Sequence, residues 1–386
     1  MRMSDERSYR QGVGSVLCSA IVLVPVLAAV LSGCSAPSGA DPVSLSMRDS
    51  LQVLADKHHV CGAAVAIVRD RKLASLESAS GCRPTSAPTA GSVFQAASLS
   101  KPVFAYAVQK LAAQGKLELD APVLRYLPQG YRHRANPLHA QPSELVTDPR
   151  LGAITVRMVL NHTSGLPNWT SGPLQVETPP GTEWQYSGEG YVLLQRAVEQ
   201  VTAQPLDRAV DSLLFEPLGM NSSAYVLNER LSQSILPGTK ANGAPRTLIA
   251  TTEAIAAFSL HTTAADYGKF LAAVLNDEAG LAQITTSPVS VDPGLGLAWG
   301  LGWGIEQTRG DTYIWQWGNN PGYRAFVIAS VRTGDGMVLL TNGENGLKLA
   351  EPVTQKILPD DHKLFQSSIL GTDLLSVLCN TVRLCL

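Results

Sequence analysis

The sequence predicts an α+β fold in which one antiparallel sheet is built from segments near both ends of the chain. Short apolar segments occur early, at 64–77, and again after residue 297, and turn-forming residues bound them. This composition is typical of strands joined by turns. The segments between them carry apolar residues at helical spacing. We therefore expect a sheet flanked by helices, with a mainly helical lobe inserted between its two halves.

The early segments predict a helix followed by a hairpin. Leucines near helical spacing predict a helix over 45–58, and residues 61–82 read CGAAVAIVRDRKLASLESASGC. A two-residue turn at Asp70-Arg71 sets Cys61 opposite position 80, and a three-residue turn sets it opposite position 81. Cys82 lies one or two positions from that register, so we predict a Cys61–Cys82 disulfide.

The remaining segments divide into a helical middle and a strand-rich end. A helix is predicted over 98–115, ending at Gly115, with Ser98 at its N-terminus. A region rich in Pro, Gly, His and Arg, 128–152, is expected to be a surface insertion with solvated charges. Further helical patterns cover 155–161, 190–203, 206–215, 262–276 and 347–357, and strand-like segments cover 297–307, 312–320, 323–332 and 336–343.

Composition limits the classes of function. The 386 residues are 45% hydrophobic, and 30 Lys and Arg against 32 Asp and Glu give a net charge of −2. A chain so balanced has no general field for nucleic acid or an acidic polymer, so a small-molecule substrate is expected. No Cys or His cluster has metal-ligand spacing, and neither a metal nor another cofactor is expected.

The N-terminal residues predict export. Arginines precede an apolar run from Val13 to Leu31, as in a secretory signal. The following Leu31-Ser32-Gly33-Cys34 resembles the bacterial lipobox, which implies cleavage after residue 33 and a lipid on Cys34. The alternative is an uncleaved transmembrane anchor, since about 20 apolar residues span a bilayer. Both interpretations place the domain on the periplasmic or extracellular face of a bacterial membrane, after a linker over 34–45.

Ser98 and Lys101 are candidates for nucleophilic catalysis. A serine hydroxyl must lose its proton as it attacks, so it needs a base within hydrogen-bond reach. A lysine three residues later on a helix lies on the same face, and the helix N-terminus stabilises an oxyanion. The pair alone is weak support, because an N-cap serine followed by a solvated lysine has the same spacing.

Further motifs make the pair more specific. Leu160–Pro167 reads LNHTSGLP, Tyr186–Tyr191 reads YSGEGY, and Glu216–Met220 reads EPLGM. Together with Ser-x-x-Lys, these resemble the serine β-lactamase and penicillin-binding protein superfamily, in particular its branch of class C β-lactamases, D-stereospecific peptidases and esterases. The resemblance runs from about Leu51 to about Ile357. It implies a β-lactamase/transpeptidase-like fold over 46–359, with 360–386 as an extension of unknown role.

The resemblance assigns roles to three residues. Ser98 would be the acylated nucleophile, Lys101 would hold its proton, and Tyr186 would be the general base. A phenol with a pKa near 10 is a base at neutral pH only if a cation lowers its pKa. Lys101 is expected to be that cation.

Two motifs depart from the family pattern. Gly188 replaces the asparagine of Tyr-x-Asn, and no Lys-Thr-Gly is present. Counting back from Pro321-Gly322-Tyr323, which resembles the family's Pro-Gly-Phe, places Gln316-Trp317-Gly318 at that motif, with Asn319 donating the second oxyanion N–H. In the alternative register the motif is Trp317-Gly318-Asn319, and Asn320 donates.

Loss of the motif's lysine removes the partner for a substrate carboxylate. We therefore expect a carboxylesterase or amidase acting on uncharged acyl groups. The alternatives are a D-amino-acid peptidase, a penicillin-binding carboxypeptidase or β-lactamase, and a non-catalytic peptidoglycan-binding or ligand-binding relative. Five tryptophans are expected either to line an apolar groove or to belong to the core: Trp184, Trp299, Trp303, Trp315 and Trp317.

Overall fold

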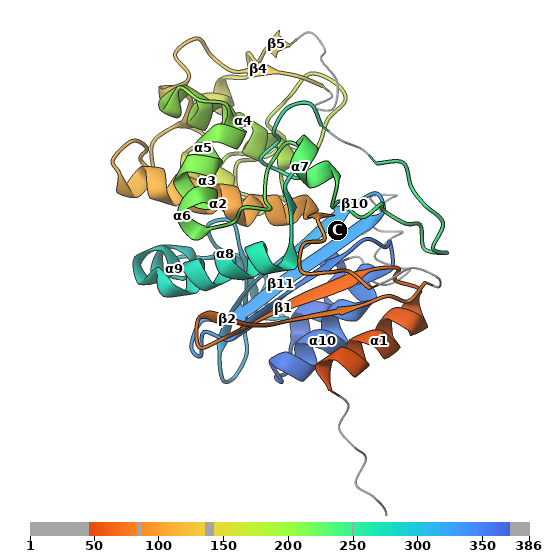
Figure 1. The fold of residues 1–386 in the computed structure, drawn as a ribbon. Helices are drawn as coiled ribbons and strands as arrows, with labels where there is room; N and C mark the ends of the chain where they lie inside the picture. Colours follow the sequence, from red (N-terminus) through yellow and green to blue (C-terminus); the bar gives the residue numbers. More distant parts are fainter. Residues whose placement is uncertain (1–45, 83–86, 136–142, 249–250, 371–386) are drawn as a thin grey trace, which may run out of the picture. The chain divides into compact units, whose positions relative to one another are not determined.

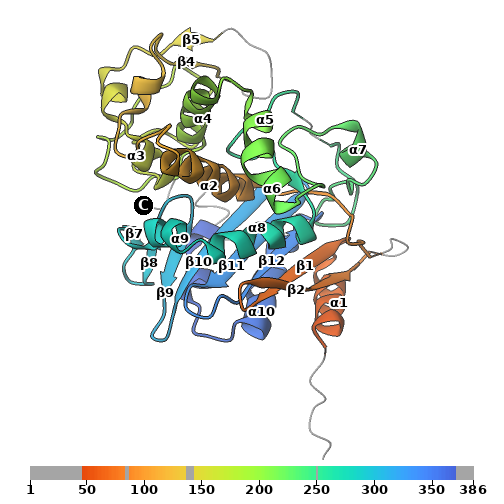
Figure 2. The ribbon, with the colours of Figure 1, turned by 60° about the vertical axis from the view of Figure 1, so that its left-hand side comes forward.

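A single antiparallel sheet of eight strands forms the centre of the domain, as predicted. The computed structural model describes residues 46–82, 87–135, 143–248 and 251–370. The strand order is β2-β1-β12-β11-β10-β9-β8-β7, so strands from the two ends of the chain pair at β1 and β12 (Figures 1 and 2). The strands are β1 (Ala63–Arg69), β2 (Lys72–Ala79), β7 (Val289–Asp292), β8 (Leu297–Trp299), β9 (Gly304–Gln307), β10 (Thr312–Asn320), β11 (Tyr323–Ser330) and β12 (Gly336–Thr341).

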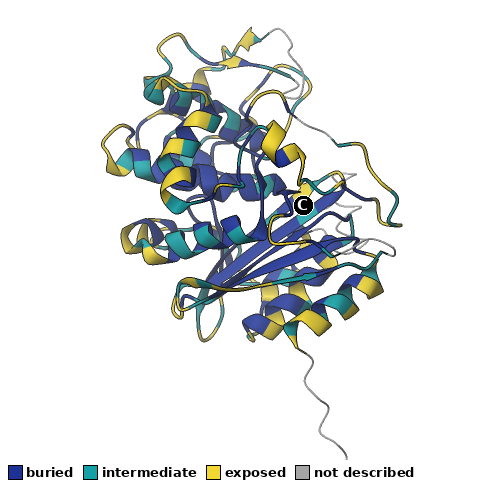
Figure 3. Cartoon of the chain, viewed as in Figure 1, coloured by how far each residue is buried: buried dark blue, intermediate teal, exposed yellow. Residues whose placement is uncertain are grey.

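Helices cover both faces of this sheet. In Figures 1 and 2, α1 (Met47–His58) and α10 (Ala350–Ile357) lie on one face, and α8 (Ala264–Asn276) lies on the other. The strands β11 and β12 are almost entirely buried between these layers (Figure 3). Apolar side chains on both faces of a strand are what a sheet covered on both sides requires.

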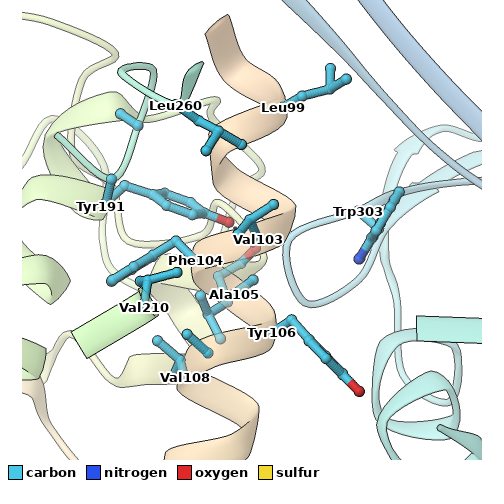
Figure 4. Packing of buried hydrophobic residues seen from close by; sticks show 14 of the residues in the cluster. Leu99, Val103, Phe104, Ala105, Tyr106, Val108, Tyr191, Val210, Leu260 and Trp303 are labelled. Atoms are coloured by element: carbon cyan, nitrogen blue, oxygen red, sulfur yellow. Dashed lines mark hydrogen bonds between the residues drawn. The ribbon is translucent and has the colours of Figure 1, made fainter. Parts of the chain in front are cut away.

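The helical lobe is inserted between β2 and β7, and α2 (Ser100–Ala113) is its central helix. Eleven of the 14 residues of α2 are buried, and apolar side chains from several other segments, including Tyr191, Leu260 and Trp303, surround it (Figure 4). A helix buried on all sides is a rigid support for the residues at its N-terminus. The other helices are α3 (Val156–Leu160), α4 (Gly188–Thr202), α5 (Leu206–Val210), α6 (Glu216–Leu218), α7 (Glu229–Ser232) and α9 (Glu278–Thr285).

Several boundaries differ from the predictions. The segment 297–307 forms two strands, because Gly300 and Gly302 lie in a turn between them. The region 128–152 is not a fully solvated insertion: it forms the short hairpin β4 (Arg132–His133) and β5 (Glu144–Leu145), and His133 is buried. Its imidazole Nε2 lies 3.1 Å from the Glu189 carboxylate, a long-range pairing that sequence spacing does not reveal.

Residues 360–370, predicted as the start of an extension, pack against the sheet. Leu364 and Leu370 are buried in the apolar cluster that also holds α10, and His362 Nδ1 lies 2.7 Å from the Glu306 carboxylate. The signal, Cys34 and the rest of the tail lie outside the described residues. In the part of the chain that is described, no helix is long and apolar enough to cross a membrane.

The predicted hairpin and its disulfide are confirmed. Asp70 and Arg71 form the turn with φ of 47° and 60°, as in the two-residue turns that suit hairpin twist. A bulge between Ile67 and Val68 shifts the register by one residue, so that Ala63 pairs with Ala79. Cys61 is thereby brought to Cys82, with the Cα atoms 4.6 Å apart.

Removing the disulfide should destabilise the domain. A disulfide between residues 21 positions apart restricts the conformations of the unfolded chain. Its loss typically lowers the free energy of unfolding by about 3 kcal/mol. We expect Cys82→Ser to lower the free energy of unfolding by that amount in urea titrations of oxidised protein. The same titrations under reducing conditions are the control, since there the two proteins should be equally stable. Equal stability in oxidising buffer would contradict the prediction.

Candidate active site

Ser98 lies in a strained turn immediately before α2. The 3₁₀ turn Ala97–Leu99 precedes the helix, and Ala97 has φ of 50°, a conformation that costs energy for a residue with a Cβ. The backbone is held by Ala96 N–H, which donates to the Leu260 carbonyl at 2.8 Å. Ala97 and Leu99 are buried, whereas Ser98 is partly exposed. The turn therefore presents the Ser98 hydroxyl at the surface of an otherwise packed segment.

Ser100, two residues later, has a structural environment. It is fully buried, its Oγ donates to the Ala97 carbonyl at 2.6 Å, and it accepts from Leu260 N–H at 3.0 Å. Both bonds hold the turn. Of the two serines in this stretch, Ser98 has the accessible hydroxyl.

Lys101 contacts Ser98 from within the core. Its side chain is 1% exposed, and Nζ donates to Ser98 Oγ at 3.2 Å and to the Ala257 carbonyl at 2.9 Å. Burial lowers the pKa of Lys101 to about 7, because an ammonium loses hydration there. A substantial fraction of Lys101 is therefore neutral at pH 7, and the neutral amine can accept a proton from the Ser98 hydroxyl.

Tyr186 completes the cluster. Lys101 Nζ lies 4.6 Å from the centroid of its ring. The phenol oxygen is buried, and none of the described residues has a group that meets hydrogen-bond geometry with it. Burial raises the pKa of Tyr186, and the nearby Ser98 hydroxyl only partly opposes this. The expectation that Lys101 lowers the pKa of Tyr186 is therefore wrong: Tyr186 stays a neutral phenol at pH 7, and Lys101 is the group with a pKa suited to a base.

His162, from the LNHTSGLP motif, fixes the segment that carries Tyr186. Its carbonyl accepts from Gln185 N–H at 2.7 Å, and its ring Nδ1 accepts from Ser187 N–H at 3.1 Å. The imidazole is fully buried and its ring centroid lies 4.3 Å from that of Tyr186. Burial, and then Lys101, lower the pKa of His162, so the ring is neutral and Nδ1 remains an acceptor. His162 thus holds the residues on either side of Tyr186.

This arrangement makes His162 a positioning residue for Tyr186. Replacing it by Phe leaves Ser187 N–H buried and unpaired and allows Tyr186 to shift. Misplacing a catalytic group by about 1 Å lowers the reaction rate by up to about 10²-fold. We expect His162→Phe to lower kcat by about 10-fold to 10²-fold with little change in KM.

The controls separate positioning from general strain. His162 has φ of 61°, and the exposed His59 has φ of 53°. His59→Phe therefore tests a bulky residue at the same backbone conformation and should leave kcat unchanged. His162→Asn, which tolerates this conformation and keeps an acceptor, should recover part of kcat. Equal kcat for His162→Phe and wild type would contradict the assigned role.

The geometry of β10 favours the first of the two registers predicted for the third motif. A Cβ on Gly318 would lie 2.5 Å from the Ala96 carbonyl and 3.1 Å from Ala97 Cβ, so the strand approaches the Ser98 turn where only glycine fits. β9 pairs with β10 only as far as Trp315. Beyond it, Trp317 N–H bonds to the side chain of Gln316. N–H groups alternate between strand edges, so Asn319 N–H lies on the same uncovered edge as Trp317 N–H.

Gln316 brings no charge to this edge. Its side chain is fully buried, Oε1 accepts from Trp317 N–H at 3.0 Å, and Nε2 has no hydrogen-bond partner in the described part of the chain. An amide can donate one bond to a neutral carbonyl but cannot neutralise a carboxylate. Trp317 points to the opposite face of the strand, where its ring centroid lies 5.1 Å from that of Tyr186.

Trp169 occupies the place that a side chain at Gly188 would take. A Cβ on Gly188 would lie 2.4 Å from Cζ2 of the Trp169 indole, and Trp169 is 37% exposed. Trp169 lies outside the motifs that predict the site. The signal for it is weak: a tryptophan shortly after LNHTSGLP, with glycine at the asparagine position.

The tryptophans that were identified divide into two sets. Trp299, Trp303 and Trp315 are buried in the core. Trp184 and Trp317 are partly exposed and flank Tyr186. Only this second pair is in a position to line a groove.

Comparisons with known proteins place most of the chain in one family. The family model described as Beta-lactamase matches residues 47–359. The esterase EstB of Burkholderia gladioli is 34% identical over an alignment of 169 residues, and the match covers 36% of this chain and 39% of the esterase. Penicillin-binding protein 4 of Amycolatopsis lactamdurans is 29% identical over an alignment of 350 residues, and the match covers 77% of this chain and 84% of that protein.

Solved structures have the same fold. A D-alanine carboxypeptidase from Burkholderia cenocepacia superposes with a TM-score of 0.67 at 19% identity, covering 81% of this chain and 98% of that one. A class C β-lactamase superposes with a TM-score of 0.66 at 19% identity, covering 81% and 94%.

Proposed function

Because the chain belongs to the beta-lactamase family of serine hydrolases, we propose that it is a carboxylesterase or amidase that acts on uncharged acyl groups through an acyl-Ser98 intermediate. The observation that carries this proposal is the contact between Ser98 Oγ and the buried Lys101 Nζ, beside the part of β10 that β9 leaves unpaired, where Gln316 stands in place of a cation.

In acylation, neutral Lys101 takes the proton from Ser98 Oγ as the oxygen bonds to the substrate carbonyl carbon. The carbonyl π-bond breaks, and the resulting oxyanion accepts from Ser98 N–H and Asn319 N–H. The tetrahedral intermediate then expels the alcohol or amine. The leaving group takes the Tyr186 proton, and Lys101 returns a proton to the phenol.

Deacylation repeats these steps with water as the nucleophile. Lys101 accepts the proton of the attacking water through Tyr186, and the water oxygen bonds to the acyl carbon. Collapse of the second oxyanion breaks the ester bond to Ser98 and returns its proton. Acid and free enzyme result, and no proton is gained or lost by the three side chains over the cycle.

Selection of neutral substrates follows from the polar groups at the edge of β10. A β-lactam or a peptide C-terminus carries a carboxylate, and a cationic partner must offset the cost of desolvating that carboxylate in the site. Gln316 offers an amide instead, and Gly188 offers no side chain. The similarity to a putative D-alanyl-D-alanine carboxypeptidase of Escherichia coli, 30% identical over 163 residues, makes a D-amino-acid peptidase the second candidate.

The test is a substrate panel on wild type and Ser98→Ala. The panel contains p-nitrophenyl esters, nitrocefin and a D-alanine amide. Turnover of the esters, at least 10²-fold above nitrocefin in kcat/KM and lost in Ser98→Ala, would support the proposal. Preference for the D-alanine amide would favour the peptidase. Turnover of none of them, with no labelling by a fluorophosphonate, would favour the non-catalytic binding relative.

We also propose that the enzyme is exported and held on a bacterial membrane by a lipid on Cys34, from the residues Leu31-Ser32-Gly33-Cys34. Wild type expressed in a bacterium should incorporate radiolabelled palmitate and fractionate with membranes. Cys34→Ala should lose the label. Membrane fractionation of both proteins without any label would instead indicate the uncleaved transmembrane anchor.

A further inference from the structure

A small cavity lies beside the candidate active site and has no role in the chemistry described above. Its volume is about 130 Å³, and Gln95, Phe258, His261, Asn320 and Pro321 contribute to its walls. A cavity of about 150 Å³ holds a benzene molecule. This one therefore has room for a group of about four to six carbon atoms.

The cavity adjoins the residues that act on the substrate. Gln95 stands three residues before Ser98, Asn320 follows Asn319, and Phe258 follows Ala257, whose carbonyl binds Lys101. The Asn320 amide joins these segments: Nδ2 donates to Gln95 Oε1 at 2.9 Å and to the Phe258 carbonyl at 3.4 Å. A carbonyl bound at Ser98 and Asn319 would have its acyl chain next to this cavity.

The cavity walls carry no formal charge. No Lys, Arg, Asp or Glu lines the cavity among the described residues, and the one titratable side chain, His261, is buried with a pKa lowered to about 4 by desolvation. His261 is therefore neutral at pH 7. A charged acyl group would lose its hydration there without a partner.

Trp169 forms the continuation of this wall. Its indole lies edge-on to the Phe258 ring, with the centroids 5.6 Å apart, and covers Gly188. Backbone contacts fix its position: Gly188 N–H donates to the Asn168 side chain at 3.0 Å, and Thr170 N–H donates to the Glu189 carboxylate at 3.2 Å. The Trp169 indole thus occupies the place that the asparagine amide of the Tyr-x-Asn motif would take.

We propose that Trp169, Phe258 and this cavity form the acyl-binding subsite, and that the preferred substrates carry a neutral acyl chain of about four to six carbons. The proposal rests on the proposed function, because it requires an acyl group at Ser98. Trp169 and Phe258 are its specificity-determining residues.

The experiment measures kcat/KM for p-nitrophenyl acetate, butyrate, hexanoate, octanoate and decanoate. In wild type, kcat/KM should rise about fourfold per added methylene up to butyrate or hexanoate and fall at octanoate. Trp169→Ala should lower kcat/KM for the best wild-type ester by about 10-fold and move the optimum to longer chains. Trp169→Phe should keep the wild-type optimum, and Leu76→Ala, which changes an exposed leucine on β2, should leave the whole profile unchanged.

A second pair of variants tests the contact itself. Gly188→Ala places a Cβ against the indole and should reduce kcat/KM for butyrate, and adding Trp169→Ala should relieve that reduction. If fluorophosphonate labels Ser98 and esters are hydrolysed, but the chain-length profile is flat or unmoved by Trp169→Ala, the subsite is wrong and the proposed function stands. If no ester is hydrolysed and Ser98 is not labelled, the proposed function itself is wrong.

Discussion

Ser98→Ala is expected to lower kcat/KM for the best ester by roughly 10⁴-fold or more, which is the scale of loss when a nucleophilic serine is removed. The variant should fold normally, because the Ser98 side chain is partly exposed and Lys101 keeps its bond to the Ala257 carbonyl. Initial-rate kinetics with circular dichroism as the folding check measures both quantities.

Ser100→Ala is the matched variant for this prediction. The Ser100 hydroxyl makes two buried hydrogen bonds that hold the turn, so its loss should lower the free energy of unfolding by about 1–3 kcal/mol. Covalent labelling at Ser98 should nevertheless persist. Labelling that survives Ser98→Ala and disappears in Ser100→Ala would exchange the roles of the two serines.

Lys101→Met is expected to lower kcat by roughly 10³-fold, within the range for removal of a general base. The pH profile of the wild type provides the associated signature. Burial lowers the pKa of Lys101 to about 7, so kcat/KM should fall about tenfold per pH unit below pH 7 as the amine is protonated. A flat profile between pH 5 and 7 would contradict a neutral Lys101 as the base.

The same substitution should stabilise the fold, with a defined pH dependence. The pKa of Lys101 is about 7 in the folded chain, against an ordinary value of 10.5. Between these pH values the unfolded chain holds a proton that the folded chain has lost, so the contribution of Lys101 to stability rises with pH across this window. Below pH 7 Lys101 lowers the free energy of unfolding by its largest amount. This amount is at most about 5 kcal/mol, because a difference of one pKa unit corresponds to about 1.36 kcal/mol.

Loss of the bond to Ala257 offsets part of this gain by about 1–3 kcal/mol. We therefore expect Lys101→Met to raise the free energy of unfolding at pH 6 by about 2 kcal/mol. The change that the substitution causes at pH 9 should be about 3 kcal/mol less favourable than the change at pH 6. Urea denaturation at both pH values measures the difference, and the exposed Lys72→Met is the control. A gain of equal size at both pH values would show that Lys101 is charged in the folded enzyme.

The sequence was sufficient for the parts of the site that are local or belong to ordered motifs. Ser98 and Lys101 lie one turn apart, and Tyr186 stands in a recognisable motif, so their proximity followed from the resemblance. The hairpin register brought Cys61 near Cys82 because strand pairing obeys a simple count. The strand pattern after residue 297 likewise predicted most of the sheet, since apolar segments between turn residues are specific to strands.

What the sequence lacked was burial and long-range contact. The pKa values of Lys101 and Tyr186 depend on the side chains that exclude water from them, and these come from segments far apart in the chain. Consequently the expected lowering of the pKa of Tyr186 was wrong, because burial raises it, and the sequence did not indicate that burial lowers the pKa of Lys101 to about 7. Trp169 is not predictable for the same reason, because its position depends on the absence of a Cβ at Gly188, 19 positions away.

The central claim is that Ser98 carries the acyl group during turnover. Its most direct test is intact-protein and peptide mass spectrometry after rapid acid quench of the enzyme with p-nitrophenyl butyrate. A butyryl adduct on the peptide that contains Ser98, localised to Ser98 by fragmentation and absent in Ser98→Ala, is the predicted result. Ester hydrolysis with the adduct on another residue, or with the same adduct in Ser98→Ala, would contradict it.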